Sequence, residues 1–324
     1  MYKLPKGYGL TLSALLSVWL LGQPVLAQDT ADEASENVQT ETELNAETFA
    51  ETDLIGRFWE LGEDQKRGIF DLRTFHPNFI LPVHYSSNPN EQPVSPTRGP
   101  GTAFESLQPN EVKLQLSLRT KLVEDILFGG DVWVAYSQTS LWQAWNSDDS
   151  SPFRSTNYKP EVFYVMPWQE QWDFIPGDAR VRLAKVGLAH ESNGQRKPDS
   201  RSWNYIYFGG AVEWGPVLWE STWKQRVNET GDDDDNPDLV RFRGNFENRF
   251  SWRNNLSTYS LTRVTRELSW DKGSWQVDFT HPINSNKPDG LRFYVQFFSG
   301  YGETLLDYNH RQNRIGIGFL LLNI

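Results

Sequence analysis

The sequence predicts an all-β fold, a twelve-stranded antiparallel transmembrane β-barrel with a polar filled interior. Apolar and polar residues alternate with a period of two in many short segments, the pattern of strands with one apolar and one polar face. Aromatic residues make up 14% of the 324 residues, which suits rings of aromatic side chains at two membrane interfaces. Hydrophobic residues make up only 38% of the chain, which argues against a bundle of transmembrane helices.

The first 27 residues have the pattern of a signal peptide. Lys3 and Lys6 precede an apolar run at 10–21, and small residues up to Ala27 fit a cleavage site. An N-terminal anchor helix is the alternative, but the apolar run is short and ends at 22–24, "GQP". We therefore expect cleavage after Ala27 and export to the bacterial outer membrane.

The segment that follows, residues 28–75, begins with a long acidic stretch that is poor in large apolar residues, so we expect it to be disordered. The barrel domain is expected to occupy residues 76–324. The formal net charge of −11 gives no reason to expect a nucleic-acid partner. The absence of cysteine excludes disulfides and thiolate metal sites.

The strands of the barrel domain are predicted from segments such as "VKLQLSLRTKL" at 112–122, "VRFRGNFENRF" at 240–250 and "LRFYVQFF" at 291–298. A soluble β-sandwich also alternates, with its apolar face against a second sheet. Long strands, an even strand count and charged residues on the inward face favour the barrel. The twelve predicted strands are 77–86, 111–122, 131–144, 158–168, 180–190, 203–213, 217–227, 238–251, 255–266, 273–282, 290–300 and 310–322.

The connections between these strands alternate in length. Those after odd-numbered strands are mostly long, as at 87–110 and 191–202, whereas the others are mostly tight, as at 215–216. In membrane barrels the long loops are extracellular and the short turns periplasmic. We therefore expect both ends of the barrel domain in the periplasm.

Three side chains of the predicted hairpin 180–213 have the chemistry of a hydrolytic triad. His190 shares the apolar face of its strand with Leu188, Ser192 follows two residues later, and Asn204 shares a face with Ile206. Polar groups facing lipid cost free energy without partners, so mutual hydrogen bonds are expected. A serine, a base and a group that orients the base form a nucleophilic site, and an inactive polar cluster at the interface is the alternative.

"HESNG" at 190–194 and "SRSWN" at 200–204 resemble the active-site hairpin of the outer membrane phospholipase A family, twelve-stranded bacterial barrels that hydrolyse phospholipids. The resemblance extends over nearly all of the barrel in order. Its further motifs are "SSPFRSTNYKPE" at 150–161, "DNPD" at 235–238, "SGYGETLLDYN" at 299–309 and "RIGIGF" at 314–319.

The resemblance implies a role for each residue of the triad. It makes Ser192 the nucleophile, His190 the general base and Asn204 the group that fixes the imidazole tautomer. A neutral amide orients the ring without placing a second charge beside lipid. Hydrolysis would cleave both acyl esters of phospholipids, and lysophospholipids, through an acyl-enzyme on Ser192.

The family also relies on calcium, which the resemblance assigns to the Ser200 hydroxyl, the Gln195 carbonyl and the Ser150 carbonyl of a second subunit. Calcium accepts such oxygen ligands, and water would supply most of the others. The Gly194 N–H would stabilise the oxyanion. Family members often carry a basic residue where this chain has Gln195. The alternative to calcium binding is that Ser150 and Ser200 only cap turns in their loops.

Activity in the family depends on reversible dimerisation, and Gln138 matches a membrane-embedded glutamine at the dimer interface. Gln138 shares the apolar face of its predicted strand with Val134 and Tyr136, where an amide favours a partner amide across a dimer. The expected function is thus a calcium-dependent phospholipase A1 and A2. A structural or pore-forming barrel is the alternative, which the many charged inward residues disfavour.

Overall fold

The computed structural model describes residues 53–148, 151–172, 175, 177–227, 234–254, 256–267 and 269–322. The predicted signal peptide at 1–27 and the first part of the predicted acidic segment, 28–52, lie outside these residues. Both stay predictions.

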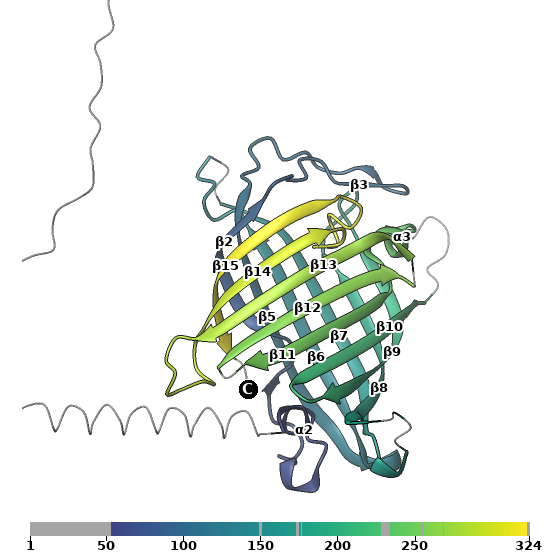
Figure 1. The fold of residues 1–324 in the computed structure, drawn as a ribbon. Coiled ribbons are helices and arrows are strands. Elements are labelled where there is room, and N and C mark those ends of the chain that lie inside the picture. Colours follow the sequence, from purple (N-terminus) through teal and green to yellow (C-terminus); the bar gives the residue numbers. More distant parts are fainter. Residues whose placement is uncertain are drawn as a thin grey trace, which may run out of the picture. The chain divides into compact units, whose positions relative to one another are not determined.

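Twelve antiparallel strands of the described chain form a closed barrel, which confirms the predicted fold (Figure 1). Each strand pairs with the next in the sequence, and β15 pairs with β2 to close the sheet. The short strand β1 (Arg73–Thr74) pairs with β5, and β3 (Val94–Ser95) and β4 (Gly99–Pro100) form a separate hairpin. The barrel strands are β2 (Asn78–Ser86), β5 (Asn110–Ile126), β6 (Gly130–Trp142), β7 (Phe153–Pro167), β8 (Ala179–Ser192), β9 (Ser202–Trp214), β10 (Val217–Arg226), β11 (Phe246–Asn254), β12 (Ser257–Arg266), β13 (Ser269–Pro282), β14 (Arg292–Gly300) and β15 (Gln312–Leu322).

One predicted strand, 238–251, is wrong in its first half, because the helix α3 (Leu239–Arg243) precedes β11. Gly244 ends this helix with a φ of 88°, and its N–H donates to the carbonyl of Val240. A positive φ, which glycine adopts without steric cost, ends a helix and interrupts an extended strand. The alternating pattern of the segment is therefore divided between two kinds of element.

As predicted, charged side chains lie on the inner face of the barrel wall and apolar side chains on the outer face. On β5, Lys113 and Arg119 are buried inside the barrel, whereas Leu116 is exposed on the outer wall. The interior is filled by ion pairs, such as those of Arg154 with Glu111 at 2.7 Å and with Asp307 at 2.9 Å. Buried charges need such partners, and this network makes the interior polar and occupies much of it, around a remaining polar cavity of about 320 Å³.

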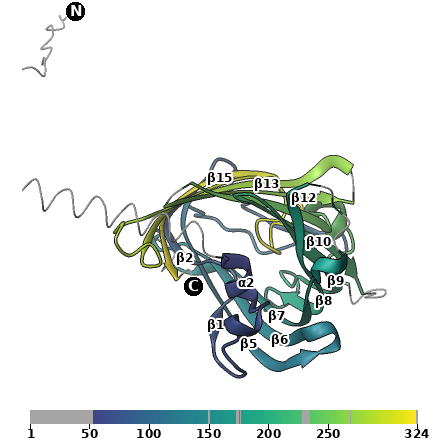
Figure 2. The same ribbon diagram turned by 60° about the horizontal axis from the view of Figure 1, so that its bottom comes forward.

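The described part of the predicted disordered segment differs from the expectation, because residues 53–75 are ordered. The helix α2 (Leu54–Trp59) begins at Asp53, whose carboxylate accepts the N–H of Gly56 at 2.9 Å. Trp59 is 4% exposed and packs edge-on against Phe163 of β7, so α2 lies in one opening of the barrel (Figure 2). The apolar residues at positions 55 and 59 give α2 a buried face, which overrides the acidic composition of the segment.

Three short 3-10 helices complete the described structure. They are η1 (Glu63–Gln65), η2 (Leu127–Gly129) and η3 (Glu170–Trp172). No helix in the described part of the chain is long and apolar enough to cross a membrane.

Candidate active site

The hairpin β8–β9 brings His190 and Asn204 together on the outer wall of the barrel. The two residues are direct partners in the strand register, and His190 Nδ1 lies 2.8 Å from Asn204 Oδ1. Because an amide oxygen only accepts, Nδ1 carries the proton and donates it. The remaining ring nitrogen, Nε2, is then able to accept a proton from another group.

Ser192 lies two residues beyond His190, at the end of β8 and on the same face. It is half-buried, and its register partners are Ser202 on β9 and Tyr158 on β7. Alternate residues of a strand are about 6.6 Å apart, which two side chains span when they turn toward each other. In the described chain the Ser192 hydroxyl forms no hydrogen bond with the imidazole, and such bonds are often loose before substrate binds.

The outer wall beside His190 forms a shallow apolar depression. Its lining includes Val134, Val162 and Leu188 together with His190 and Asn204. The imidazole is exposed at the edge of this surface. The pair is therefore accessible from the outer wall of the barrel.

The loop after Ser192 has a backbone shape that glycine favours at position 194. Gly194 has a φ of 64°, and a Cβ built on it would lie 2.9 Å from the ring of Tyr158. The neighbouring Asn193 orders the loop, because its Oδ1 accepts the N–H of Arg201 at 2.9 Å and the N–H of Gln195 at 3.3 Å. Asn193 was not predicted as a residue of the site, although asparagine commonly makes such local turns.

The predicted calcium ligands are only partly described. Ser150 lies outside the described residues, and Gln195 is exposed in the loop. The Ser200 hydroxyl donates to the carboxylate of Asp235, which also pairs with Arg98 at 2.5 Å. No group of three His, Cys, Asp or Glu side chains in the described residues forms a metal cluster.

The donor set at this loop nevertheless fits calcium, because the Ser200 hydroxyl, the Gln195 carbonyl and the adjacent Asp235 carboxylate are all hard oxygen donors. In the sequence Asp235 is part of the motif "DNPD", and no role was predicted for it. Its contact with Ser200 joins loops that are 35 residues apart, so no local pattern could have predicted it.

Gln138 lies on the outer wall of β6, where the alternation predicted it. Its Oε1 accepts the Tyr136 hydroxyl at 3.1 Å, and its Nε2 donates to Ser140 Oγ at 3.4 Å. The amide is thus paired along its own strand in the single chain.

Comparison with known proteins identifies the family. The sequence profile of the phospholipase A1 family matches residues 55–321. The phospholipase A1 of Salmonella typhimurium is 33% identical over 258 residues, 79% of this chain and 83% of that protein. The phospholipase A1 of Escherichia coli K12 is 35% identical over 221 residues, 67% of this chain and 71% of that protein.

Solved structures agree with the sequence comparison. The outer membrane phospholipase A of Escherichia coli superposes with a TM-score of 0.69 at 30% identity, covering 82% of this chain and 96% of that chain. An Escherichia coli structure described as an active-site mutant, with an asparagine changed to alanine, superposes equally well. The Salmonella typhi outer membrane phospholipase, a dimer with bound calcium, has a TM-score of 0.67 at 32% identity, covering 78% and 93% of the two chains. The chain therefore belongs to the phospholipase A1 family.

Proposed function

We propose that the protein hydrolyses the acyl esters of phospholipids and lysophospholipids in the outer membrane. The observation that carries the proposal is the hydrogen bond between His190 and Asn204 on the lipid-facing wall of a barrel of this family. A soluble hydrolase binds its substrate in a cleft, whereas a phospholipid ester lies at the membrane interface. A site on the outer wall suits such a substrate.

His190 Nε2 removes the proton of the Ser192 hydroxyl as the oxygen attacks the ester carbonyl. The Asn204 oxygen holds the proton on Nδ1 and so keeps the imidazole in the form that accepts at Nε2. The base then returns its proton to the leaving alcohol, and water releases the fatty acid from Ser192 by the same route. The Escherichia coli active-site mutant that lacks an asparagine supports this role for Asn204.

Gly194 supplies a backbone N–H to the oxyanion that forms on the substrate carbonyl. Gly194 lies two residues after Ser192, and its positive φ turns the chain at this point. Ser200 and Gln195, with Ser150 of a second subunit, would hold calcium. When bound, the ion supplies positive charge that stabilises the same oxyanion.

Two copies of the chain would complete this arrangement, with Gln138 of each at the interface. The Salmonella typhi relative, a dimer with bound calcium, supports both the metal and the pairing. Export through a cleaved signal peptide at 1–27 places the barrel in the outer membrane.

The test is hydrolysis of phospholipid in detergent micelles with calcium or with chelator. Ser192→Ala and His190→Ala should each abolish measurable hydrolysis, because the first variant lacks the proposed nucleophile and the second lacks the proposed base. Chelation should lower the rate of the parent protein. Hydrolysis that survives both substitutions would contradict the proposal and favour a structural or pore-forming barrel.

A further inference from the structure

Glu191 lies between the predicted base and nucleophile and points to the opposite side of the wall. It is 5% exposed and lies inside the barrel, whereas His190 and Ser192 lie on the outer face of the same strand. We infer that Glu191 and Arg243 form a positioning pair that fixes the catalytic strand from within. This inference rests on the proposed function of Ser192 and His190.

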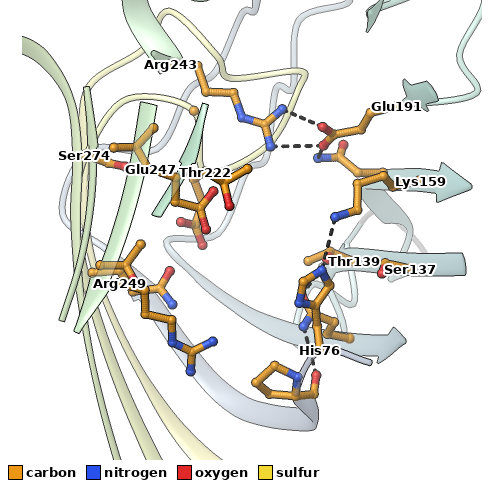
Figure 3. Close-up of a pocket in the computed structure, with 18 of the residues that line it drawn as sticks. His76, Ser137, Thr139, Lys159, Glu191, Thr222, Arg243, Glu247, Arg249 and Ser274 are labelled. Atoms are coloured by element: carbon orange, nitrogen blue, oxygen red, sulfur yellow. Dashed lines mark hydrogen bonds and ion pairs between the residues drawn. The ribbon is translucent and has the colours of Figure 1, made fainter. Parts of the chain in front are cut away.

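The pair is a bidentate ion pair across the interior of the barrel. Arg243 Nη1 lies 2.8 Å from Glu191 Oε2, and Arg243 Nη2 lies 3.0 Å from Glu191 Oε1 (Figure 3). Two parallel hydrogen bonds fix the orientation of a carboxylate as well as its place. Arg243 ends α3, so a helix outside the catalytic hairpin determines where Glu191 sits.

The Glu191 carboxylate also binds both strands that flank β8. Trp203 Nε1 of β9 donates to Oε2 at 3.0 Å, and Asn157 Nδ2 of β7 lies 3.5 Å from Oε1. Trp203 is the register partner of Glu191 and directly precedes Asn204. One carboxylate therefore connects the strand of the base and nucleophile with the strand of the orienting amide.

Arg243 is itself held in place by close packing. Its aliphatic chain passes over Gly302, where a Cβ would lie 2.3 Å from Arg243 Cγ. Its guanidinium carbon lies 5.6 Å from the centre of the Trp203 ring. The arginine thus reaches Glu191 through a space that a larger residue at 302 would close.

The consequence for catalysis follows from the geometry of a strand. Neighbouring side chains point to opposite faces of one backbone, so a twist of the strand at Glu191 also turns His190 and Ser192. A displacement of about 1 Å at a reacting group can lower a rate about 100-fold. Without Arg243 the Glu191 carboxylate keeps its Trp203 and Asn157 contacts but loses its bidentate cation, so it would shift toward the polar cavity of about 320 Å³ to regain hydration and would pull the strand with it.

The test compares Glu191→Gln, Arg243→Met and the double variant in the full-length protein, with kcat and KM measured separately. Each single change should lower kcat roughly 10- to 100-fold while KM changes less than about twofold, since the substrate surface lies on the other face. The double variant should lose no more than the worse single variant, because both changes remove one interaction. Arg243→Lys, which keeps the charge but not the bidentate contact, should fall between the parent and Arg243→Met.

The matched control is Lys121→Gln. Lys121 is another fully buried cation of the interior, paired with Asp131 at 2.7 Å, but it lies at the end of the barrel near α2. All rates are normalised to the folded fraction, measured by the heat-modifiable migration of the barrel on gels. Unchanged kcat in the single variants, multiplying losses in the double variant, or an equal loss in Lys121→Gln would overturn the inference.

Hydrogen exchange measured by mass spectrometry separates this inference from the proposed function. Glu191→Gln and Arg243→Met should raise exchange of the amides at 190–192 and 202–204, and Lys121→Gln should not. Equal exchange in all variants would overturn the positioning role whether or not the protein is active. If hydrolysis by the parent does not depend on Ser192, the proposed function fails instead.

Discussion

The hydrogen bond from His190 to Asn204 fixes one protonation form of a ring that faces lipid. At 2.8 Å the Nδ1–H donates to the amide oxygen, and Nε2 stays free to act as a base. A carboxylate in place of the amide would add a charge that is costly to desolvate. The amide supplies orientation without that cost.

Asn204→Ala should lower kcat about 10- to 100-fold, because the imidazole loses its fixed tautomer and orientation. The folded fraction should stay near that of the parent, since Asn204 lies on the outer wall and its strand pairing uses the backbone. The measurement is phospholipid hydrolysis per folded protein. An unchanged kcat would remove Asn204 from the mechanism.

Gly194→Ala should lower kcat more than Gly215→Ala does. The new methyl would lie 2.9 Å from the Tyr158 ring and would displace the backbone N–H assigned to the oxyanion. Gly215→Ala is the matched control, because Gly215 also has a positive φ, 52°, but no atom lies within 4 Å of a Cβ there. Both variants carry a backbone strain of about 1–2 kcal/mol. Equal kcat values in the two variants would contradict the role of Gly194.

The sequence predicted the strand residues of the site better than its loop residues. The alternation of two strands was enough to place His190 and Asn204 on one face. Asn193 and Asp235 act through turns and through contacts between distant loops, which follow no period. Glu191 was not singled out from the sequence, and its partner Arg243 lies 52 residues away.

Among the elements, α2 depends on charge as well as on its buried aromatic face. Glu60, at its C-terminal end, pairs with Arg73 at 2.6 Å and with Lys121 at 2.9 Å. Burial alone would raise the pKa of the Glu60 carboxyl. The hydrogen bonds from Lys121 and the Arg67 N–H, with the nearby positive charges, hold this pKa below its ordinary value of 4.5.

Acid should therefore release α2 from the barrel opening. Because the pKa of Glu60 is lower in the folded state, its stabilising effect is complete above about pH 4.5 and is lost as the pH falls through the folded value. The chain has no cysteine, so a spin label on Arg57→Cys would be unique and would lie on the exposed face of α2. Label mobility should rise in acid.

Glu60→Gln should abolish most of this pH dependence, because the titrating group is gone. In this variant the mobility of the label should change much less with pH than in the parent. At neutral pH it should already be close to the mobility that the parent reaches in acid. A profile that is the same with and without Glu60 would assign the acid response to other carboxylates.

The elements that the sequence placed least well are those in which two patterns overlap. Residues 238–251 alternate like one strand, yet Gly244 divides them into α3 and β11. The acidic composition before residue 53 led to a prediction of disorder through residue 75, and the short helix α2 was therefore not predicted. Elsewhere the period of two located every barrel strand within a few residues, because each strand has one face toward the polar interior and one toward lipid.

For the whole molecule, closure of the sheet replaces the disulfides that the chain lacks. The pairing of β15 with β2 leaves the barrel without a free edge, and buried ion pairs link strands across the interior. The outer wall is correspondingly apolar, with Phe293 and Phe297 exposed on β14. A polar group on that wall is therefore a position where a second molecule can add a hydrogen bond.

Gln138 is such a group, and Gln138→Leu should weaken a calcium-dependent dimer about tenfold. The amide pairs only with Tyr136 and Ser140 of its own strand in the described chain, at 3.1 and 3.4 Å, and both contacts can be exchanged for a partner amide. Polar contacts between membrane segments contribute on the order of 1 kcal/mol, close to the 1.4 kcal/mol that corresponds to tenfold in affinity.

Sedimentation equilibrium in detergent with calcium measures this dimer constant. Asn248→Leu is the matched control, because Asn248 is an amide on the outer wall of β11, paired with Trp219 and several strands away from β6. The control should leave the dimer constant unchanged, and both variants should keep the thermal stability of the parent, since neither amide supports the interior. Equal weakening by the two substitutions would show that loss of any outer amide has this effect. Weakening by Gln138→Leu alone would place the interface at β6, which only β7 separates from the hairpin that carries the site.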